Sequence, residues 1–404
     1  MFKRTTWSFF SGSQFTFGPG SVGSLAGVIE RRQAKRVFVI SDRVLESTGL
    51  VSHVVAAIAQ TQATSKRFLD GEVEPSTDLI ATVADQATEF RPDLFVALGG
   101  GSNMDLAKAV ASVHTHACRA EKLIGFDAVP GPVLPLVCLP TTAGTGSEMT
   151  HSAIIRNSTT GKKASILSQH VRPNVAIVDP QLTLSCPAKV TAESGIDALT
   201  HAIEAYLVTN FYSFSENLEH GLPYEGNHPL GDMYAEKAIR LIGESLHRAV
   251  DEPENLAARS SMAFAATLAG AAFSTCGVSL AHALEYPIGS KYKCSHGAGN
   301  GIVLPAVMRF WLASRQSRVA KIASMLGVAG ADQMPDQEAA HAAIEAVERL
   351  RSDIGLPTCL SDVGAKSEDL VELATTAISL QRLLDLSPVN TTFDDAKNIL
   401  RASL

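Results

Sequence analysis

A chain of 404 residues with 46% hydrophobic content is long enough to bury more than one core, so we expect two globular domains. Its formal charge of −7 provides no basic surface for a phosphate backbone, so nucleic acid is excluded as an expected partner. Its apolar runs are too short to cross a bilayer, no signal peptide is visible, and the six cysteines form no C-x-x-C pair, so we expect a cytoplasmic protein with no membrane partner.

The first half of the chain alternates short apolar runs with amphipathic stretches. The apolar runs lie at 37–40, 94–98, 134–139 and 175–178. This alternation predicts parallel strands joined by helices, in an α/β domain with a Rossmann-like sheet. Because ligands bind beyond the carboxyl ends of strands in such sheets, we expect the four loops after these runs to line one crevice.

The second half shows helical spacing with few strand signals. From about Lys189 onward, apolar residues recur at helical intervals in 196–207, 235–246, 256–272 and 341–350. The change of period and Pro187 predict two domains, an α/β domain over 1–187 and an all-helical domain over 188–404. The segment 210–232 interrupts the helices, and both a functional ordered loop and a disordered insertion remain open for it.

A glycine-rich turn follows the second apolar run and precedes a helix. Unhindered backbone N–H groups and the positive end of the helix would meet a pyrophosphate there. The turn consists of Gly99, Gly100, Gly101 and Ser102. Alone it is a weak signal, since a tight connection between a strand and a helix has the same composition.

Asp42 follows the first apolar run, where a carboxylate can bind an adenosine ribose and repel the additional phosphate of NADP. We therefore predict NAD as the cofactor. The alternative is an ordinary turn aspartate that caps the next helix.

The loop after the third apolar run is rich in hydroxyl groups and glycine, which supply rotatable hydrogen-bond donors near phosphates and ribose. Its candidate cofactor-binding side chains are Thr141, Thr142, Thr145 and Ser147. Lys163 lies further along the chain and is able to neutralise a phosphate, although a solvated surface lysine is the default interpretation.

Four residues of the second half have the types and spacing of a metal site. Asp197 and His201 are four residues apart in a helical pattern, so both side chains lie on one face. His282 and His296 supply two further nitrogen ligands. One carboxylate and three imidazoles suit Fe²⁺ or Zn²⁺, although each histidine alone is more often structural. An ion there would act as a Lewis acid on an alcohol or carbonyl oxygen, beside a nicotinamide held between the two domains.

These residues together resemble the iron-containing alcohol dehydrogenase family, which shares its fold with dehydroquinate synthase. The resemblance begins at 17–20 and becomes thin beyond about Pro305. The matching motifs are 99–102 with Asp105 and Lys108, then 140–148, 195–204, Ala281-His282 and His296-Gly297.

The resemblance implies an NAD(P)-binding N-terminal domain, a helical metal domain, a bound ferrous ion (zinc in some members) and a homodimer or larger assembly. It adds Asp105 to the cofactor loop and makes Lys163 a cofactor contact. It also implies Asp197, His201, His282 and His296 as the metal ligands.

One position departs from the family pattern. Many members carry a histidine four residues after the third metal ligand, whereas this chain has Tyr286. Tyr286 lies one helical turn from His282, and these two are our candidate catalytic residues. A tyrosine here, together with 224–232, is similar to the hydroxyacid-oxoacid transhydrogenase branch, which oxidises 4-hydroxybutyrate and reduces 2-oxoglutarate on a bound nicotinamide.

Three hypotheses follow. The first is an NAD-dependent dehydrogenase of a small alcohol, aldehyde or hydroxyacid, with the transhydrogenase as its variant. The second is a metal- and NAD-dependent lyase like dehydroquinate synthase, which steady NADH formation from simple alcohols would exclude. The third is a catalytically silent scaffold, against which the complete ligand set argues.

Overall fold

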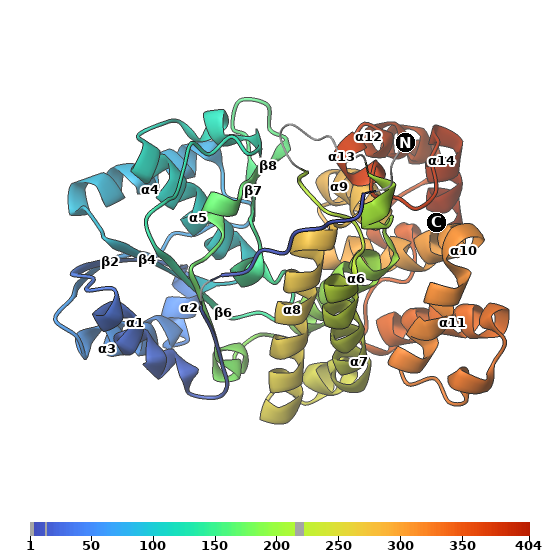
Figure 1. Ribbon diagram of the computed structural model, residues 1–404, viewed down its shortest axis with the longest axis horizontal. Helices are drawn as coiled ribbons and strands as arrows, with labels where there is room; N and C mark the ends of the chain where they lie inside the picture. The colour runs from blue at the N-terminus through green and yellow to red at the C-terminus, as the bar shows by residue number, and fades with distance from the viewer. Residues whose placement is uncertain (1–3, 13, 215–221) are drawn as a thin grey trace. The chain divides into compact units, whose positions relative to one another are not determined.

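The computed structural model describes residues 4–12, 14–214 and 222–404, which form two compact units (Figure 1). One unit is 10–186 and the other is 187–404 together with the first residues of the chain. Residues 4–9, which the sequence pattern placed with the first domain, make their contacts in the second unit. There the Trp7 ring stacks on His228 with ring centroids 4.3 Å apart.

The first unit is built on a six-stranded sheet in which every neighbouring pair is parallel. In spatial order the strands are β1 (Gln14–Phe17), β9 (Val175–Val178), β6 (Leu136–Pro140), β4 (Leu94–Gly99), β2 (Arg36–Ile40) and β3 (Thr64–Phe68). The four strands expected from the apolar runs are confirmed. The two edge strands were missed, since β3 has the sequence TSKRF and exposes most of its residues.

Helices cover both faces of this sheet, in keeping with the alternation of side chains along a strand. Val37 and Val39 of β2 belong to a core shared with α1 (Ser24–Arg31) and α3 (Leu50–Ala59). The intervening Phe38 belongs to the opposite core, shared with α4 (Thr77–Phe90) and α5 (Gly101–His116). The predicted Rossmann-like α/β class is therefore confirmed.

A small three-stranded sheet extends the first unit, with the order β5 (Gly125–Phe126), β8 (Lys163–Leu167), β7 (Ser152–Arg156). In the large sheet Gly99 pairs with Pro140, so the loops after β4 and β6 both begin at the carboxyl ends of neighbouring strands. This register brings together the two loops that the sequence singled out for a cofactor.

The second unit is helical in its described residues. Its α-helices are α6 (Ala188–Leu207), α7 (Pro229–Asp251), α8 (Leu256–Cys276), α9 (Leu280–Tyr292), α10 (His296–Met325), α11 (Asp336–Asp353), α12 (Leu370–Ile378), α13 (Gln381–Leu384) and α14 (Phe393–Ala402). α8 is apolar and long enough to span a bilayer, but 72% of its apolar window is buried and it packs against α6 and α7, as a core helix does.

The expected loop over 210–232 is partly outside the described residues, at 215–221. Its two described flanks pair with each other, since the Phe211 N–H donates to Asn227 O at 3.0 Å and the Asn227 N–H donates to Thr209 O at 2.7 Å. α7 then begins at Pro229, where proline is favoured because a first-turn N–H has no helical partner.

Candidate metal centre and cofactor loops

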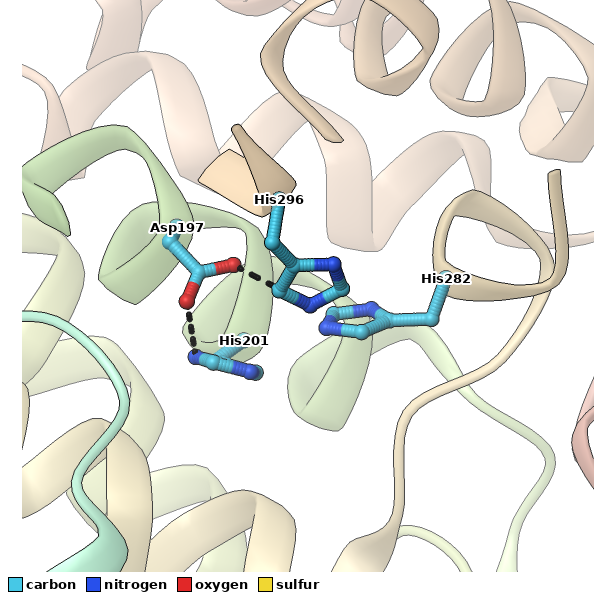
Figure 2. Close-up of side chains that lie close together, drawn as sticks. All are labelled: Asp197, His201, His282 and His296. Atoms are coloured by element: carbon cyan, nitrogen blue, oxygen red, sulfur yellow. Dashed lines mark ion pairs between the residues drawn. The ribbon is translucent and has the colours of Figure 1, made fainter. Parts of the chain in front are cut away.

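Four side chains from three helices converge in the second unit (Figure 2). Asp197 and His201 come from α6, His282 from the first turn of α9, and His296 from the first residue of α10. One ligand atom from each lies within 4.8 Å of all the others. The structure thus brings together all four residues that the sequence pattern selected.

A close approach of two helices places His296 at the cluster. A Cβ atom added to Gly297 would lie 1.9 Å from the Glu193 carbonyl oxygen, so only glycine allows α10 to begin this near α6. His296 is half-buried, whereas Asp197, His201 and His282 are buried.

The candidate donor atoms of the four side chains lie close together. His201 Nδ1 lies 3.8 Å from Asp197 Oδ2, and His296 Nε2 lies 3.7 Å from Asp197 Oδ1. Burial by itself raises the pKa of Asp197, but the three surrounding imidazoles outweigh burial and the pKa is lowered. A buried carboxylate that stays charged among three imidazoles is the donor set that a divalent iron or zinc ion requires, so these residues fit the expected metal.

Two buried glutamates, which the sequence reasoning did not select, orient the histidines. His282 Nδ1 lies 2.6 Å from Glu204 Oε2, and Glu204 also accepts the N–H groups of Ser279 and Ala281 at 3.0 and 2.7 Å. His296 Nδ1 hydrogen-bonds Glu285 Oε2. A partner on Nδ1 leaves Nε2 to face the cluster, which is the arrangement usual behind metal-binding histidines. Glu204 was detectable in principle, because 197, 201 and 204 lie on one helical face.

Asn300, one turn after His296, is a third residue that the sequence reasoning missed. Its Nδ2 lies 2.9 Å from Asp197 Oδ1 and 3.3 Å from Nε2 of both His282 and His296. Asn300 is fully buried, so its carboxamide belongs to the interior of the cluster.

Two aromatic rings border the cluster. Phe273 stacks on His201 with ring centroids 4.2 Å apart. The Tyr286 ring lies 6.1 Å from that of His296, which places this candidate catalytic side chain beside the candidate metal ligands. Its catalytic role stays a prediction.

In the first unit, the glycine-rich turn leaves its backbone open at the start of α5. Gly99 has φ +148°, and a Cβ atom there would lie within 2.9 Å of the Asn103 side chain. Gly100 caps α5 without a side chain, so the first N–H groups of the helix remain available to an anion. A Cβ atom on Gly101 would meet Thr145 at 2.7 Å, so the two predicted loops touch. The turn fits a pyrophosphate.

Several predicted cofactor residues make contacts inside the first unit. Ser147 Oγ donates to Asp105 at 2.7 Å and accepts from Lys108 Nζ at 2.7 Å. Asp105 also accepts the Ile154 N–H at 2.9 Å. Lys108 is fully buried, and burial lowers its pKa. These groups join the two loops to α5, and direct contact of Asp105 and Ser147 with a cofactor stays a prediction. Thr141 is buried, and Thr142 and Ser102 are half-buried.

Asp42 and Lys163 also have partners. Asp42 accepts the Leu45 N–H at 3.0 Å, which caps α2 (Arg43–Ser47), and accepts from Asn103 Nδ2 at 2.7 Å. Lys163 Nζ lies 2.7 Å from a carboxylate oxygen of Glu74. The capping role that was the alternative for Asp42 is therefore present, and the ribose and cofactor contacts stay predictions.

The families and the relatives that this chain matches point to one group of enzymes. Residues 12–180 match the family described as iron-containing alcohol dehydrogenase, and residues 191–404 match the C-terminal part of the Fe-containing alcohol dehydrogenase family. The NAD-dependent methanol dehydrogenase of Bacillus methanolicus is 34% identical over 92% of this chain and 93% of its own length. Long-chain-alcohol dehydrogenase 1 of Geobacillus thermodenitrificans is 36% identical over 96% and 94%. Among solved structures, an alcohol dehydrogenase from Oenococcus oeni has a TM-score of 0.92 at 29% identity, over 99% of this chain and 100% of that one.

Proposed function

The chain belongs to the iron-containing alcohol dehydrogenase family, and we propose that it is a metal-dependent oxidoreductase that transfers a hydride between NAD and a small alcohol or aldehyde. The observation that carries this proposal is the convergence of Asp197, His201, His282 and His296 within 4.8 Å. A scaffold that had lost its chemistry would have no need to keep one buried carboxylate among three oriented imidazoles.

The side chains of the cluster would hold the metal, which supplies Lewis acidity to the substrate oxygen when bound. Glu204 and Glu285 hold Nδ1 of His282 and His296, so that both Nε2 atoms face the same point. Phe273 covers one face of His201 and excludes water from it. Tyr286 carries a phenol beside His296 and is the candidate to hydrogen-bond the substrate or to relay its proton.

In the α/β unit the N–H groups at the start of α5 would bind the pyrophosphate of NAD, with Thr142 and Thr145 in the adjoining loop. Fe²⁺ is the proposed ion, with Zn²⁺ as the other candidate. A cytoplasmic location, which the sequence pattern favours, and a homodimer or larger assembly, which the family resemblance implies, also belong to this proposal.

Two alternative activities differ from this one in how they use the nicotinamide. Tyr286 in place of the family histidine favours the hydroxyacid-oxoacid transhydrogenase variant, in which 2-oxoglutarate would reoxidise the bound nicotinamide. A lyase like dehydroquinate synthase would use NAD only transiently and would accumulate no NADH.

The test is a substrate panel on protein reconstituted with Fe²⁺ or Zn²⁺. Primary alcohols, diols and 4-hydroxyacids are supplied with NAD, aldehydes are supplied with NADH, and the nicotinamide absorbance is followed. We expect steady turnover with at least one small alcohol or aldehyde. A second arm adds 2-oxoglutarate to test the transhydrogenase. Metal-loaded protein that turns over none of the panel would contradict the proposal.

A further inference from the structure

One buried amide faces the metal cluster from the interior of the helical unit. Asn300 lies one turn after His296 in α10, and it has no exposed surface. Its Nδ2 lies 2.9 Å from Asp197 Oδ1 and 3.3 Å from Nε2 of both His282 and His296. Asn300 therefore contacts three of the four candidate ligands with a single nitrogen atom.

Tight helix packing holds this amide in place. A Cβ atom added to Gly301 would lie 3.0 Å from the Ile196 side chain, and one added to Gly299 would lie 2.9 Å from the Glu285 side chain. The residues on both sides of Asn300 are thus small enough for α10 to approach α6 and α9 closely. The backbone of Asn300 is therefore held against the two helices that carry the other candidate ligands.

The neighbouring groups decide which end of the carboxamide faces the cluster. Exchange of its nitrogen and oxygen would place a carbonyl oxygen 2.9 Å from a carboxylate oxygen of Asp197, and two acceptors repel each other at that distance. The two Nε2 atoms are also acceptors, because Nδ1 of His282 and Nδ1 of His296 are each bonded to a glutamate. The NH₂ group therefore points at the cluster.

The other end of the carboxamide has no protein partner. Asn300 Oδ1 is buried and accepts no hydrogen bond from any residue that the structure describes. A buried acceptor without a partner destabilises a fold, so the stability of the helical unit does not account for an asparagine here. A leucine of similar volume would fill the same space without an unpaired polar atom.

Asp197 has two oxygens that face other candidate ligands. Oδ1 lies 3.7 Å from His296 Nε2, and Oδ2 lies 3.8 Å from His201 Nδ1. A carboxylate is able to bind an ion through one oxygen or through both. Because Asn300 donates to Oδ1, Oδ2 is the oxygen left for an ion. An ion takes the lone pairs of the Nε2 atoms, so the bond to Asp197 is the one that the amide retains.

We propose that Asn300 is a positioning residue that restricts Asp197 to one coordinating oxygen, so that the cluster offers four donor atoms and selects ions that accept four-coordinate geometry. Zn²⁺ accepts four nitrogen and oxygen donors, and imidazole donors suit Fe²⁺ as well, whereas Mn²⁺ favours six oxygen ligands. This inference rests on the proposed function, because it requires the cluster to hold a metal. It assigns the choice of ion to a residue outside the ligand set.

The test uses Co²⁺ as a visible probe of the coordination number. Metal-free protein is titrated with Co²⁺ under anaerobic conditions, and the visible absorption is recorded, because four-coordinate Co²⁺ absorbs far more strongly than six-coordinate Co²⁺. We expect the strong absorption in the wild type and its loss when Zn²⁺ displaces Co²⁺. Weak absorption by Co²⁺ bound to the wild type would overturn the proposal without any variant.

Two variants of similar side-chain volume separate the hydrogen bond from the filling of space. Asn300→Leu removes the donor and frees the second oxygen of Asp197, so the absorption should weaken and the Zn²⁺ affinity should fall by about 10- to 100-fold. Asn300→Asp adds a carboxylate at the same place, so competition titrations should show a shift in preference from Zn²⁺ toward Mn²⁺. Wild-type absorption and Zn²⁺ affinity in Asn300→Leu would show that Asn300 only fills space, and the proposal would be wrong.

A third variant controls for the loss of a buried amide as such. Asn227→Leu removes a buried side chain that donates to Asp232 Oδ1 and is not part of the cluster. It should leave the Co²⁺ absorption and the Zn²⁺ affinity unchanged, even where the melting temperature changes. Circular dichroism of each metal-free variant checks that helical content is retained. If Asn300→Leu does not fold, Asn300→Asp and the wild-type absorption decide the proposal.

The outcomes separate this inference from the proposed function. Four-coordinate absorption and the expected variant effects, without turnover on the substrate panel, would contradict the proposed function alone. Turnover by the wild type, with identical metal binding by the wild type and Asn300→Leu, would overturn this inference alone. Absence of Co²⁺ and Zn²⁺ binding by the wild type would contradict both.

Discussion

At the scale of single residues, the geometry of the metal cluster depends on the four candidate ligands and equally on the side chains that hydrogen-bond to them. Glu204 accepts three hydrogen bonds, from His282 and from the N–H groups of Ser279 and Ala281. It therefore holds the imidazole and the backbone from which the imidazole projects. A ligand held in this way loses little freedom when an ion binds.

Replacing His282 with alanine should lower metal occupancy and activity together, because one of four donors is removed. Metal content is measured by atomic spectroscopy after reconstitution, and the rate is measured with the best substrate of the panel. His341→Ala, at an exposed position of α11, is the matched control. Wild-type metal content together with a wild-type rate would remove His282 from the site.

Glu204→Gln should weaken metal binding by about 10- to 100-fold, because the substituted amide no longer both orients His282 Nδ1 and accepts the two backbone N–H groups. Competition with a chelator of known affinity measures the change. Glu338→Gln, on an exposed part of α11, serves as the control. An unaltered affinity would show that Glu204 only supports the fold.

Asp42→Asn tests the predicted preference for NAD. Asparagine keeps the oxygen that caps α2 but removes the charge that would repel the 2′-phosphate of NADP. The ratio of kcat/KM for NAD to that for NADP should fall. If the ratio is unchanged, Asp42 acts as a capping residue and not as a ribose contact.

At the scale of elements, the start of α7 depends on the protonation of one imidazole. His228 caps this helix by accepting the Gly231 N–H on Nδ1 at 3.1 Å, and its ring is buried against Trp7. An acceptor nitrogen carries no proton, so the cap requires neutral histidine. Burial accordingly lowers the pKa of His228 to about 4.

The stability of the helical unit should therefore decline as the pH falls from about 6.5 to about 4. Over this interval the unfolded histidine binds a proton and the folded one does not, so protonation favours the unfolded state. Urea unfolding of metal-free protein at several pH values measures the effect. His228→Asn keeps a capping oxygen without a titrating ring and should reduce the dependence on pH in this interval. An identical pH profile for wild type and variant would contradict the assignment.

At the scale of the whole molecule, the metal site joins helices that are distant in sequence. Its candidate ligands come from α6, α9 and α10, so a bound ion would connect three helices of one unit. An ion that binds only the folded state stabilises it by about 2.7 kcal/mol at a concentration 100 times its Kd. This stabilisation should act mainly on the helical unit, because that unit contains all four candidate ligands.

Chelation should lower the melting temperature of the helical unit by several degrees. Trp7 and Trp311 are the two tryptophans of the chain, and both belong to this unit, so tryptophan fluorescence reports its unfolding selectively. NAD added to metal-free protein should instead affect the circular dichroism transition of the α/β unit. Fluorescence melting that is insensitive to Fe²⁺, Zn²⁺ and chelator would show that no ion binds the cluster.

Some features follow from local sequence alone. The central strands β2, β4, β6 and β9, the glycine turn before α5 and the pairing of Asp197 with His201 on one face of α6 were all predicted. Each depends on a period of 2 or 3.6 residues or on a short motif, which neighbouring residues specify by themselves. The edge strand β3 was not predicted, because its residues are mostly exposed and polar or charged and show no apolar alternation.

Other features required the folded chain. Glu204 acts on a histidine 78 residues away, and Arg382 binds Tyr224 across 158 residues. No local pattern encodes such pairs, because hydrogen bonds between distant residues arise only when helix packing brings their side chains together. The residue types of the candidate metal centre could therefore be predicted from residue spacing, whereas the groups that orient its histidines emerged only from the packing of α6, α9 and α10.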